Sequence, residues 1–153
     1  MKGFTLIELV VSVAILGILA SMAAPMGEVI IRRNKERELK LDLMEIRNAL
    51  DAYKLSYDQG HIIRTVGLSG YPPSLQILVD GVDDAKSPNG KKIYFLRRVP
   101  KDPFSPPNLI GEGSWGLRCY DSTAKEPKSG ADVFDVYSMS EAVGLNGVPY
   151  KEW

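Results

Sequence analysis

Cysteine and histidine are nearly missing from this sequence. Its 153 residues include one cysteine, Cys119, and one histidine, His61. A single cysteine excludes a disulfide within the chain, and these two residues cannot supply a cysteine–histidine zinc cluster. We expect Cys119 to be a small, half-buried core residue and His61 to lie in a surface loop. We also find no glycine-rich phosphate loop and no carboxylate pair with a base, so no enzyme activity is predicted.

Proline and glycine are scarce in the first third of the chain. The whole chain has a formal net charge of zero. Only Gly17, Pro25 and Gly27 interrupt the stretch from Phe4 to Tyr57, although the sequence holds 10 prolines and 14 glycines. The first part therefore favours helix and the second part favours turns. Lysine plus arginine and aspartate plus glutamate both number 19. This balance gives no overall field that would attract nucleic acid.

An apolar run near the N-terminus is long enough to cross a bilayer. Between Glu8 and Glu28 lie about 19 residues without charge, and about 20 are needed for a membrane-spanning helix. A secretory signal peptide is the alternative, with a small-residue cleavage site in the segment 20–24. Two features argue against it. The basic region is Lys2 alone, and Glu8 stands where such a peptide is purely apolar.

Glu8 is the informative residue of this run. A carboxylate in hydrocarbon costs several kcal/mol unless it is paired or solvated, so such residues are usually functional. Judged by residue type, its neighbours within helical reach offer no partner; they are Phe4, Thr5, Val11 and Ser12. We therefore expect the partner to be the chain's own N-terminus, another chain or headgroup water. The alternative is that Glu8 extends to the membrane surface from its place near the helix start.

The segment 2–8, KGFTLIE, closely resembles the processing signal of type IV pilins and type II secretion pseudopilins. The resemblance implies that a membrane-embedded prepilin peptidase cuts between Gly3 and Phe4 and methylates the new amine of Phe4. Gly3 lacks a Cβ, so an extended backbone can enter a protease cleft closely. Glu8 would then neutralise the amine, in its own subunit or, as the family implies, in a neighbour. Mispaired subunits would bury two lone charges, so this pair sets the register of assembly.

Two further features of the run fit helix association. The small residues would let neighbouring helices approach closely; they are Ser12, Ala14, Gly17, Ala20 and Ala23. Pro25 lacks an N–H and should kink or locally melt the helix, as a matching proline does in the family's filaments. One feature disagrees with the family. The basic residues between 32 and 37 come after the run, and the positive-inside rule would keep the C-terminal part of the chain in the cytoplasm.

The stretch from Glu28 to about Tyr57 has the pattern of an amphipathic helix. Apolar residues recur at spacings of three and four and form one stripe: Leu39, Leu43, Ile46, Leu50, Tyr53 and Tyr57. Charged pairs at i,i+4, such as Glu36–Lys40 and Arg47–Asp51, occupy the other side. Gly60 is the expected stop. The stripe spans about three heptads, so we favour packing on a domain over a coiled coil.

The remaining residues predict a small β-rich domain. Strands are expected within 91–99, 114–120 and 132–139, and Ser74 is a candidate N-cap for a short helix. The predicted fold class is α+β, with a long N-terminal helix packed on an antiparallel sheet of three or four strands. The predicted division is a leader at 1–3, an apolar membrane or filament-core helix at 4–27, an amphipathic helix at 28–59 and a globular domain at 60–153.

The domain also resembles one branch of the family. The segments YPPSL at 71–75, PKDP at 100–103 and FDVYS at 134–138 occur in the order found in the major pseudopilins of type II secretion systems. Those proteins typically bind calcium in the loop after the last of these segments. Here that loop offers only Ser140, Glu141 and Asn146, with Glu152 further on, whereas calcium takes six to eight oxygens. We therefore predict no cofactor and assign no metal ligands, with calcium left open.

The resemblance implies a structural subunit of a protein-export machine. It would sit in the inner membrane as a single-pass protein with its C-terminal domain in the periplasm. It would polymerise with itself and other pseudopilins into a periplasmic filament, helped by an inner-membrane assembly platform and a cytoplasmic ATPase. The alternatives are a type IV pilus subunit for adhesion, twitching or DNA uptake, and a secreted protein that begins near Met26. Adhesive pilins usually close a C-terminal loop with two cysteines, which this chain cannot do.

Overall fold

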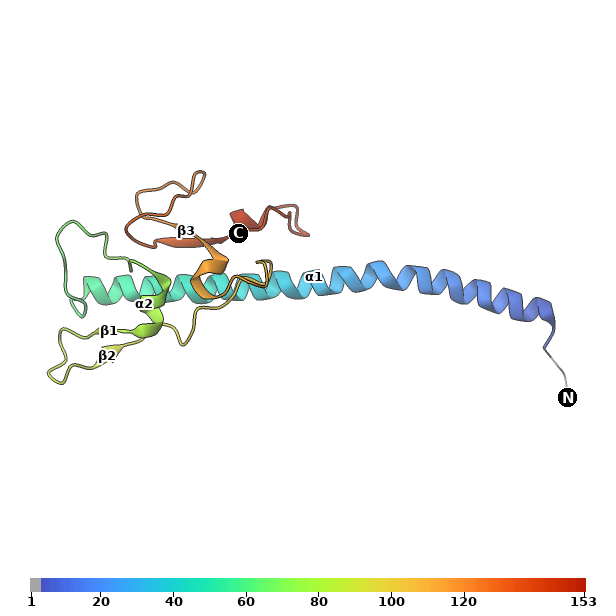
Figure 1. The fold of residues 1–153 in the computed structure, drawn as a ribbon, viewed down its shortest axis with the longest axis horizontal. Helices are drawn as coiled ribbons and strands as arrows, with labels where there is room; N and C mark the ends of the chain where they lie inside the picture. Colours follow the sequence, from blue (N-terminus) through green and yellow to red (C-terminus); the bar gives the residue numbers. More distant parts are fainter. Residues whose placement is uncertain (1–3) are drawn as a thin grey trace. The chain divides into compact units, whose positions relative to one another are not determined.

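The computed structural model describes residues 4–153, apart from the side chains of residues 22–26. One long helix, α1 (Leu6–Asp58), begins the structure (Figure 1). The chain divides into two compact units, the first ending at Lys35 and the second running from Glu36 to Trp153. Because the division falls inside α1, each unit contains part of this helix.

The end of α1 and its buried stripe agree with the sequence. Gly60 follows the last helical turn with a φ of 78°, a conformation that glycine adopts without strain. Five of the six stripe residues are buried in the domain core: Leu39, Leu43, Ile46, Leu50 and Tyr53. Tyr57 packs at the edge of the same core. The amphipathic part of α1 therefore supplies one wall of the hydrophobic core, as predicted.

The β-structure forms two small ribbons instead of one sheet. Strand β1 (Val82–Asp83) pairs with β2 (Lys92–Ile93), and β3 (Trp115–Arg118) pairs with β4 (Asp135–Ser138), both antiparallel. Figure 1 draws the ribbons apart from each other, with the short helix α2 (Leu75–Asp80) between them. The α+β class is confirmed, but the single sheet of three or four strands is wrong. The segment after Ile93 leaves the ribbon because the N–H groups of Phe95 and Leu96 donate to the Leu78 carbonyl oxygen of α2.

The start of α2 corrects a second detail. Ser74 occupies the N-cap position, but its side chain makes no capping bond. Instead, Glu112 of the 3-10 helix η1 (Gly111–Ser114) accepts the N–H groups of Leu75 and Gln76 through Oε2, at 2.6 and 3.2 Å. A carboxylate at a helix N-terminus provides the same capping as a serine hydroxyl and adds a favourable charge. The cap thus comes from a residue far along the sequence.

Burial alternates along one strand of the second ribbon. In β4, Val136 and Ser138 are buried while Asp135 and Tyr137 are half-buried. Gly116 on β3 lies opposite Tyr137, and a Cβ there would stand 2.3 Å from the tyrosine ring. Only glycine fits beneath that ring. A last 3-10 turn, η2 (Tyr150–Glu152), ends the chain and buries Tyr150 in the core.

Candidate processing and assembly site

Glu8 caps the N-terminus of α1. The backbone N–H and the hydroxyl of Thr5 both donate to Glu8 Oε2, at 2.9 and 2.8 Å. In return, the N–H of Glu8 donates to Thr5 Oγ1 at 3.4 Å. This reciprocal pattern is a capping box, with Thr5 at the N-cap and Glu8 three residues later. The positive end of the helix dipole further favours a carboxylate in the first turn.

This cap corrects the expectation that nothing within helical reach pairs with Glu8. The expectation considered formal charges and overlooked hydrogen bonds to the first turn. Thr-x-x-Glu before an apolar run is the sequence signature of a capping box, so the signal is present in the residues 5–8. Ser12, the other polar neighbour, donates its hydroxyl to the backbone carbonyl of Glu8 at 2.7 Å. The carboxylate is therefore held at the head of the helix.

The predicted cleavage point lies just ahead of this cap. Gly3 is outside the described residues, whereas Phe4 is described and its side chain is 84% exposed. Phe4 and Thr5 are not helical, because α1 begins at Leu6. A protease binds its substrate in an extended conformation, and Phe4 lies ahead of the first helical turn. Cleavage between Gly3 and Phe4 stays a prediction.

The first unit exposes nearly every apolar side chain that is described in it. The large ones from Phe4 to Leu19 are all exposed, and Leu16, for example, is 64% exposed. Gly17 has no atom within 4 Å of the place where a Cβ would stand. Glycine costs a helix interior about 1 kcal/mol relative to alanine, and no contact with the described side chains explains that cost. An apolar surface of this extent marks a binding surface or a membrane-contacting one.

The predicted apolar span and the predicted role of Pro25 both involve residues 22–26, whose side chains the structure does not describe. The predicted span over 4–27 includes them, and so does Pro25. The backbone of α1 continues through position 25 as one helix, so the helix is not locally melted there in the single chain. Loosening at Pro25 during assembly stays a prediction. Within the described residues, no helix is both long and apolar enough to cross a membrane.

In the globular domain, two of the sequence motifs meet. Asp102 of the PKDP segment is fully buried, and its Oδ2 accepts the hydroxyl of Ser138 from β4 at 2.6 Å. Its Oδ1 accepts the N–H of Phe104 at 2.7 Å, and its own N–H donates to Ser114 Oγ at 3.2 Å. The motifs are separate in the sequence, and the structure shows that they form one hydrogen-bonded joint. A buried carboxylate with several donors is well satisfied.

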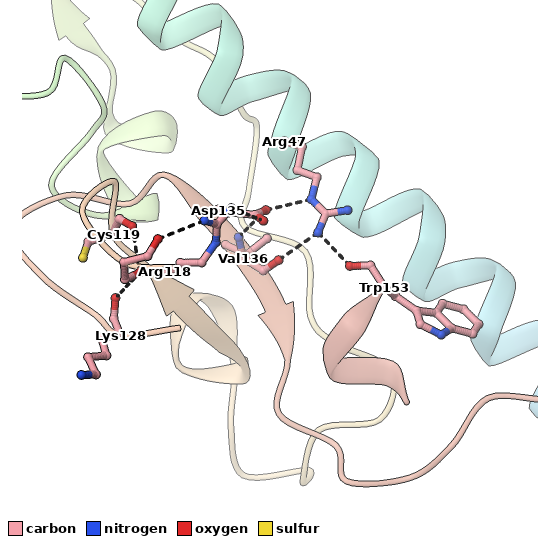
Figure 2. A network of polar contacts seen from close by, with 8 residues as sticks. Arg47, Arg118, Cys119, Lys128, Asp135, Val136 and Trp153 are labelled. Carbon is pink, nitrogen blue, oxygen red and sulfur yellow. Dashed lines mark hydrogen bonds and ion pairs between the residues drawn. The ribbon is translucent and has the colours of Figure 1, made fainter. Parts of the chain in front are cut away.

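A second joint fastens β4 and the chain's end to α1 (Figure 2). Arg47 donates from Nε to Asp135 Oδ1 at 2.8 Å, and from Nη2 to the carbonyl oxygens of Val136 and Trp153 at 3.3 and 2.8 Å. Arg118 of β3 contacts the other oxygen of Asp135 at 3.1 Å. The predicted surface pair between Arg47 and Asp51 is therefore wrong. Arg47 faces the domain because Asp135 is its ion-pair partner.

Cys119 and His61 agree with their predicted places. Cys119 is a partly buried free thiol after β3. His61 follows α1 and its Nδ1 lies 2.9 Å from Asp84 Oδ1. This contact, together with the Lys86 N–H, lowers the pKa of Asp84 below its usual value. Among the described residues, neither side chain contacts the Asp102 joint, and we assign both to the fold and not to the candidate site.

Comparison with known proteins first defines the class. Residues 1–24 match the family model of the prokaryotic N-terminal methylation motif. Together with the long helix and the small antiparallel ribbons, this motif places the chain among pilin-like proteins. No solved structure matches the chain significantly.

The curated relatives then give the particular family. The chain is 35% identical to type II secretion system core protein G of Pseudomonas aeruginosa, over 86% of this chain and 89% of that protein. It is 34% identical to the protein of the same name in Escherichia coli K12, covering 82% and 81%. The Aeromonas hydrophila protein of that name is 31% identical, covering 86% and 87%. The chain therefore belongs to the type II secretion system core protein G family, the major pseudopilins. This membership supports a pseudopilin over the alternative, a type IV pilus subunit.

Proposed function

We propose that this pseudopilin is made as an inner-membrane precursor, is cut between Gly3 and Phe4 and is methylated at Phe4 by a prepilin peptidase. Residues 4–27 hold it in the membrane and the globular domain lies in the periplasm. It then polymerises with itself and other pseudopilins into a filament. The protein is a structural subunit and performs no catalysis. The observation that carries the proposal is the capping box of Thr5 and Glu8 at the head of an exposed apolar helix.

Processing would change the charge at the head of α1. Cleavage would create an amine on Phe4, with an ordinary pKa near 8, one residue before the capping box. The bonds from Thr5 hold the Glu8 carboxylate at this end of the helix. A neighbouring subunit's amine could therefore meet a carboxylate whose position is already fixed. Preorganisation of this kind reduces the ordering cost of association.

Assembly would also cover the apolar surface of the first unit. Because the described large apolar side chains from Phe4 to Leu19 are all exposed in the single chain, burial must come from lipid or from other subunits. Gly17 and the small residues beside it would allow the helices to pack closely. The basic residues from Arg32 to Arg37 oppose this orientation under the positive-inside rule. We nevertheless propose that the domain lies outside the cytoplasm, which is the orientation that the resemblance to pseudopilins implies.

The role in export rests on the relatives, which are named as core proteins of type II secretion systems. We propose that the filament formed by this chain drives proteins through an outer-membrane secretin. An inner-membrane assembly platform and a cytoplasmic ATPase would power its growth. The buried hydrogen bonds of Asp102 and the part-buried ones of Arg47 tie segments of the domain together, which suits a subunit that transmits force.

The test is the intact mass and the N-terminal sequence of the protein from the membrane fraction of its native bacterium. We expect a chain that starts at Phe4 and carries one added methyl group. A chain that starts near Met26 would lack Glu8 and the whole apolar run. That result would contradict the proposal and indicate an ordinary secreted protein.

A further inference from the structure

The segment after β4 returns to α1 and is held there by side chains of that helix. Glu36, Lys40 and Arg47 are spaced by four and seven residues, so they lie along one side of α1. Each contacts the last part of the chain, residues 142–153. We call this segment the C-terminal loop.

Glu36 makes the central contact. Its Oε1 accepts the backbone N–H of Leu145 at 2.7 Å and the hydroxyl of Tyr150 at 2.9 Å. Tyr150 is fully buried, and its ring stacks on Phe104 with the centroids 4.1 Å apart. One carboxylate oxygen thus joins the tip of the loop to its buried anchor. Hydrogen bonds to a charged group are about twice as strong as neutral ones.

Lys40 and Arg47 hold the end of the loop. The Nζ of Lys40 lies 4.6 Å from the centre of the Trp153 ring, and Arg47 donates to the Trp153 carbonyl oxygen, as Figure 2 shows. The indole N–H of Trp153 donates in turn to the Val148 carbonyl oxygen at 3.2 Å. Gly144 is buried beneath that ring, because a Cβ there would stand 2.5 Å from Trp153 Cζ2. The loop is closed by packing as well as by charge.

The oxygens of this loop fit calcium poorly. Asn146 Oδ1 accepts the N–H of Val148 at 3.0 Å, and the Val148 carbonyl oxygen accepts both Gly144 N–H and the indole. The carbonyl oxygens of Ala142 and Gly144 also accept backbone N–H groups of the loop. Among the described residues, no three His, Cys, Asp or Glu side chains gather as a metal site requires. Calcium takes six to eight oxygens, most often with several carboxylates, and these oxygens of the loop are already hydrogen-bonded within it.

We propose that the C-terminal loop is ordered by Glu36 of α1 and does not need the calcium ion that its family uses there. The carboxylate accepts the donors that fix the loop, while Lys40 and Arg47 fix its end. The loop is therefore closed as soon as α1 and the domain have folded. Its structure should not depend on the calcium concentration outside the cytoplasm. This inference concerns the folded domain and stands whether or not the filament proposal is correct.

The test is hydrogen exchange of the full chain in detergent, followed for the amides of residues 141–150. It is run with a calcium chelator and with about 5 mM calcium chloride, above the range of weak extracellular calcium sites. We expect equal exchange rates for the wild-type chain in both conditions. In Glu36→Ala, the loss of two charged hydrogen bonds should raise these rates by about tenfold or more. Glu141→Ala, which removes the carboxylate just ahead of the loop, is the matched control and should exchange like the wild type.

Two results would overturn the inference. The first is a wild-type loop whose exchange slows about tenfold when calcium is added, which means that an ion orders it. The second is a loop that loosens in Glu141→Ala and not in Glu36→Ala. The wild-type comparison needs no variant, so it decides the question even if Glu36→Ala fails to fold.

Discussion

Leu16 and Leu50 lie on the same helix and have opposite surroundings. Leu16, in the first unit, is 64% exposed, whereas Leu50, in the second, is 1% exposed. Both units have leucine and isoleucine on α1, but only the second unit also contains the globular domain that buries them. The difference teaches that the second unit buries its own apolar stripe, whereas the large apolar side chains described in the first are left for lipid or other subunits to cover.

The largest effect is expected at the junction that processing would use. Gly3→Trp should abolish cleavage, because a bulky side chain prevents close approach of the backbone to the peptidase. The mass of the chain should then retain residues 1–3. Gly3→Ala is the matched smaller change and should retain most of the cleavage. A Gly3→Trp chain that is cut as completely as the wild type would show that the site lies elsewhere.

A matched pair of truncations on α1 tests the comparison itself. Leu50→Ala should lower the free energy of unfolding of the domain by about 3 kcal/mol, because it leaves a cavity in the core. Leu16→Ala should change it by less than about 0.5 kcal/mol, since the side chain is exposed. Denaturant unfolding of the full chain in detergent measures both. Filament yield should fall in Leu16→Ala despite its normal stability, and equal destabilisation by the two changes would contradict the account.

Breaking the hydrogen bonds between the PKDP segment and β4 should lower the free energy of unfolding slightly less than Leu50→Ala does. Asp102→Asn replaces a buried carboxylate that accepts Phe104 N–H and Ser138 Oγ–H, and we expect a loss of about 2 kcal/mol. Ser138→Ala should cost about 1 kcal/mol, and the double variant should lose less than the sum because the two residues share one bond. Asp121→Asn, at an exposed turn, is the control. Additive losses would mean that the joint is not a unit.

The smallest expected effect is a stabilisation, at Asp42 of α1. Burial, with Glu38 and Glu45 nearby, raises the pKa of Asp42 from 3.8 to about 6, so the folded domain binds a proton more tightly than the unfolded chain. The ionised carboxylate therefore opposes folding increasingly as the pH rises from 3.8 to about 6. Asp42→Asn should stabilise the domain by about 1 kcal/mol at neutral pH, a value reduced for solvent screening. It should give no gain below the ordinary aspartate pKa.

The control for that change is Asp51→Asn on the exposed side of the same helix. Unfolding curves at acidic and neutral pH should then separate burial of Asp42 from a general effect of charge. A stabilisation that is equal at both pH values would contradict the assigned cause.

The sequence predicted the features that depend on local periodicity. The stripe from Leu39 to Tyr53 and the end of α1 near Gly60 follow from spacing and turn chemistry alone. The cap of Glu8 by Thr5 is equally local, so it was predictable, although formal charges alone do not reveal it. The sheet was misjudged because β1 and β2 have two residues each, too few to show alternation.

The remaining features depend on distant residues that only the folded chain brings together. Glu112 replaces Ser74 as the cap of α2, and Asp102 accepts a hydrogen bond from Ser138, which is 36 positions away in the sequence. Glu36 reaches Tyr150 across 114 positions. Charge pattern suggested local pairs for Glu36 and Arg47, because helical spacing is visible in a sequence and tertiary proximity is not. For these residues, the contacts could not have been predicted from one sequence.

The most direct test of the central claim, that Glu8 serves assembly, is to measure processing and filament yield together in Glu8→Ala. We predict normal cleavage and methylation but a yield about tenfold or more below the wild type, because an amine is left unpaired on assembly. Thr5→Ala, which weakens the cap and keeps the carboxylate, should reduce the yield much less. Wild-type filament yield from correctly processed Glu8→Ala would contradict the account, since the carboxylate would then serve only to cap its own helix.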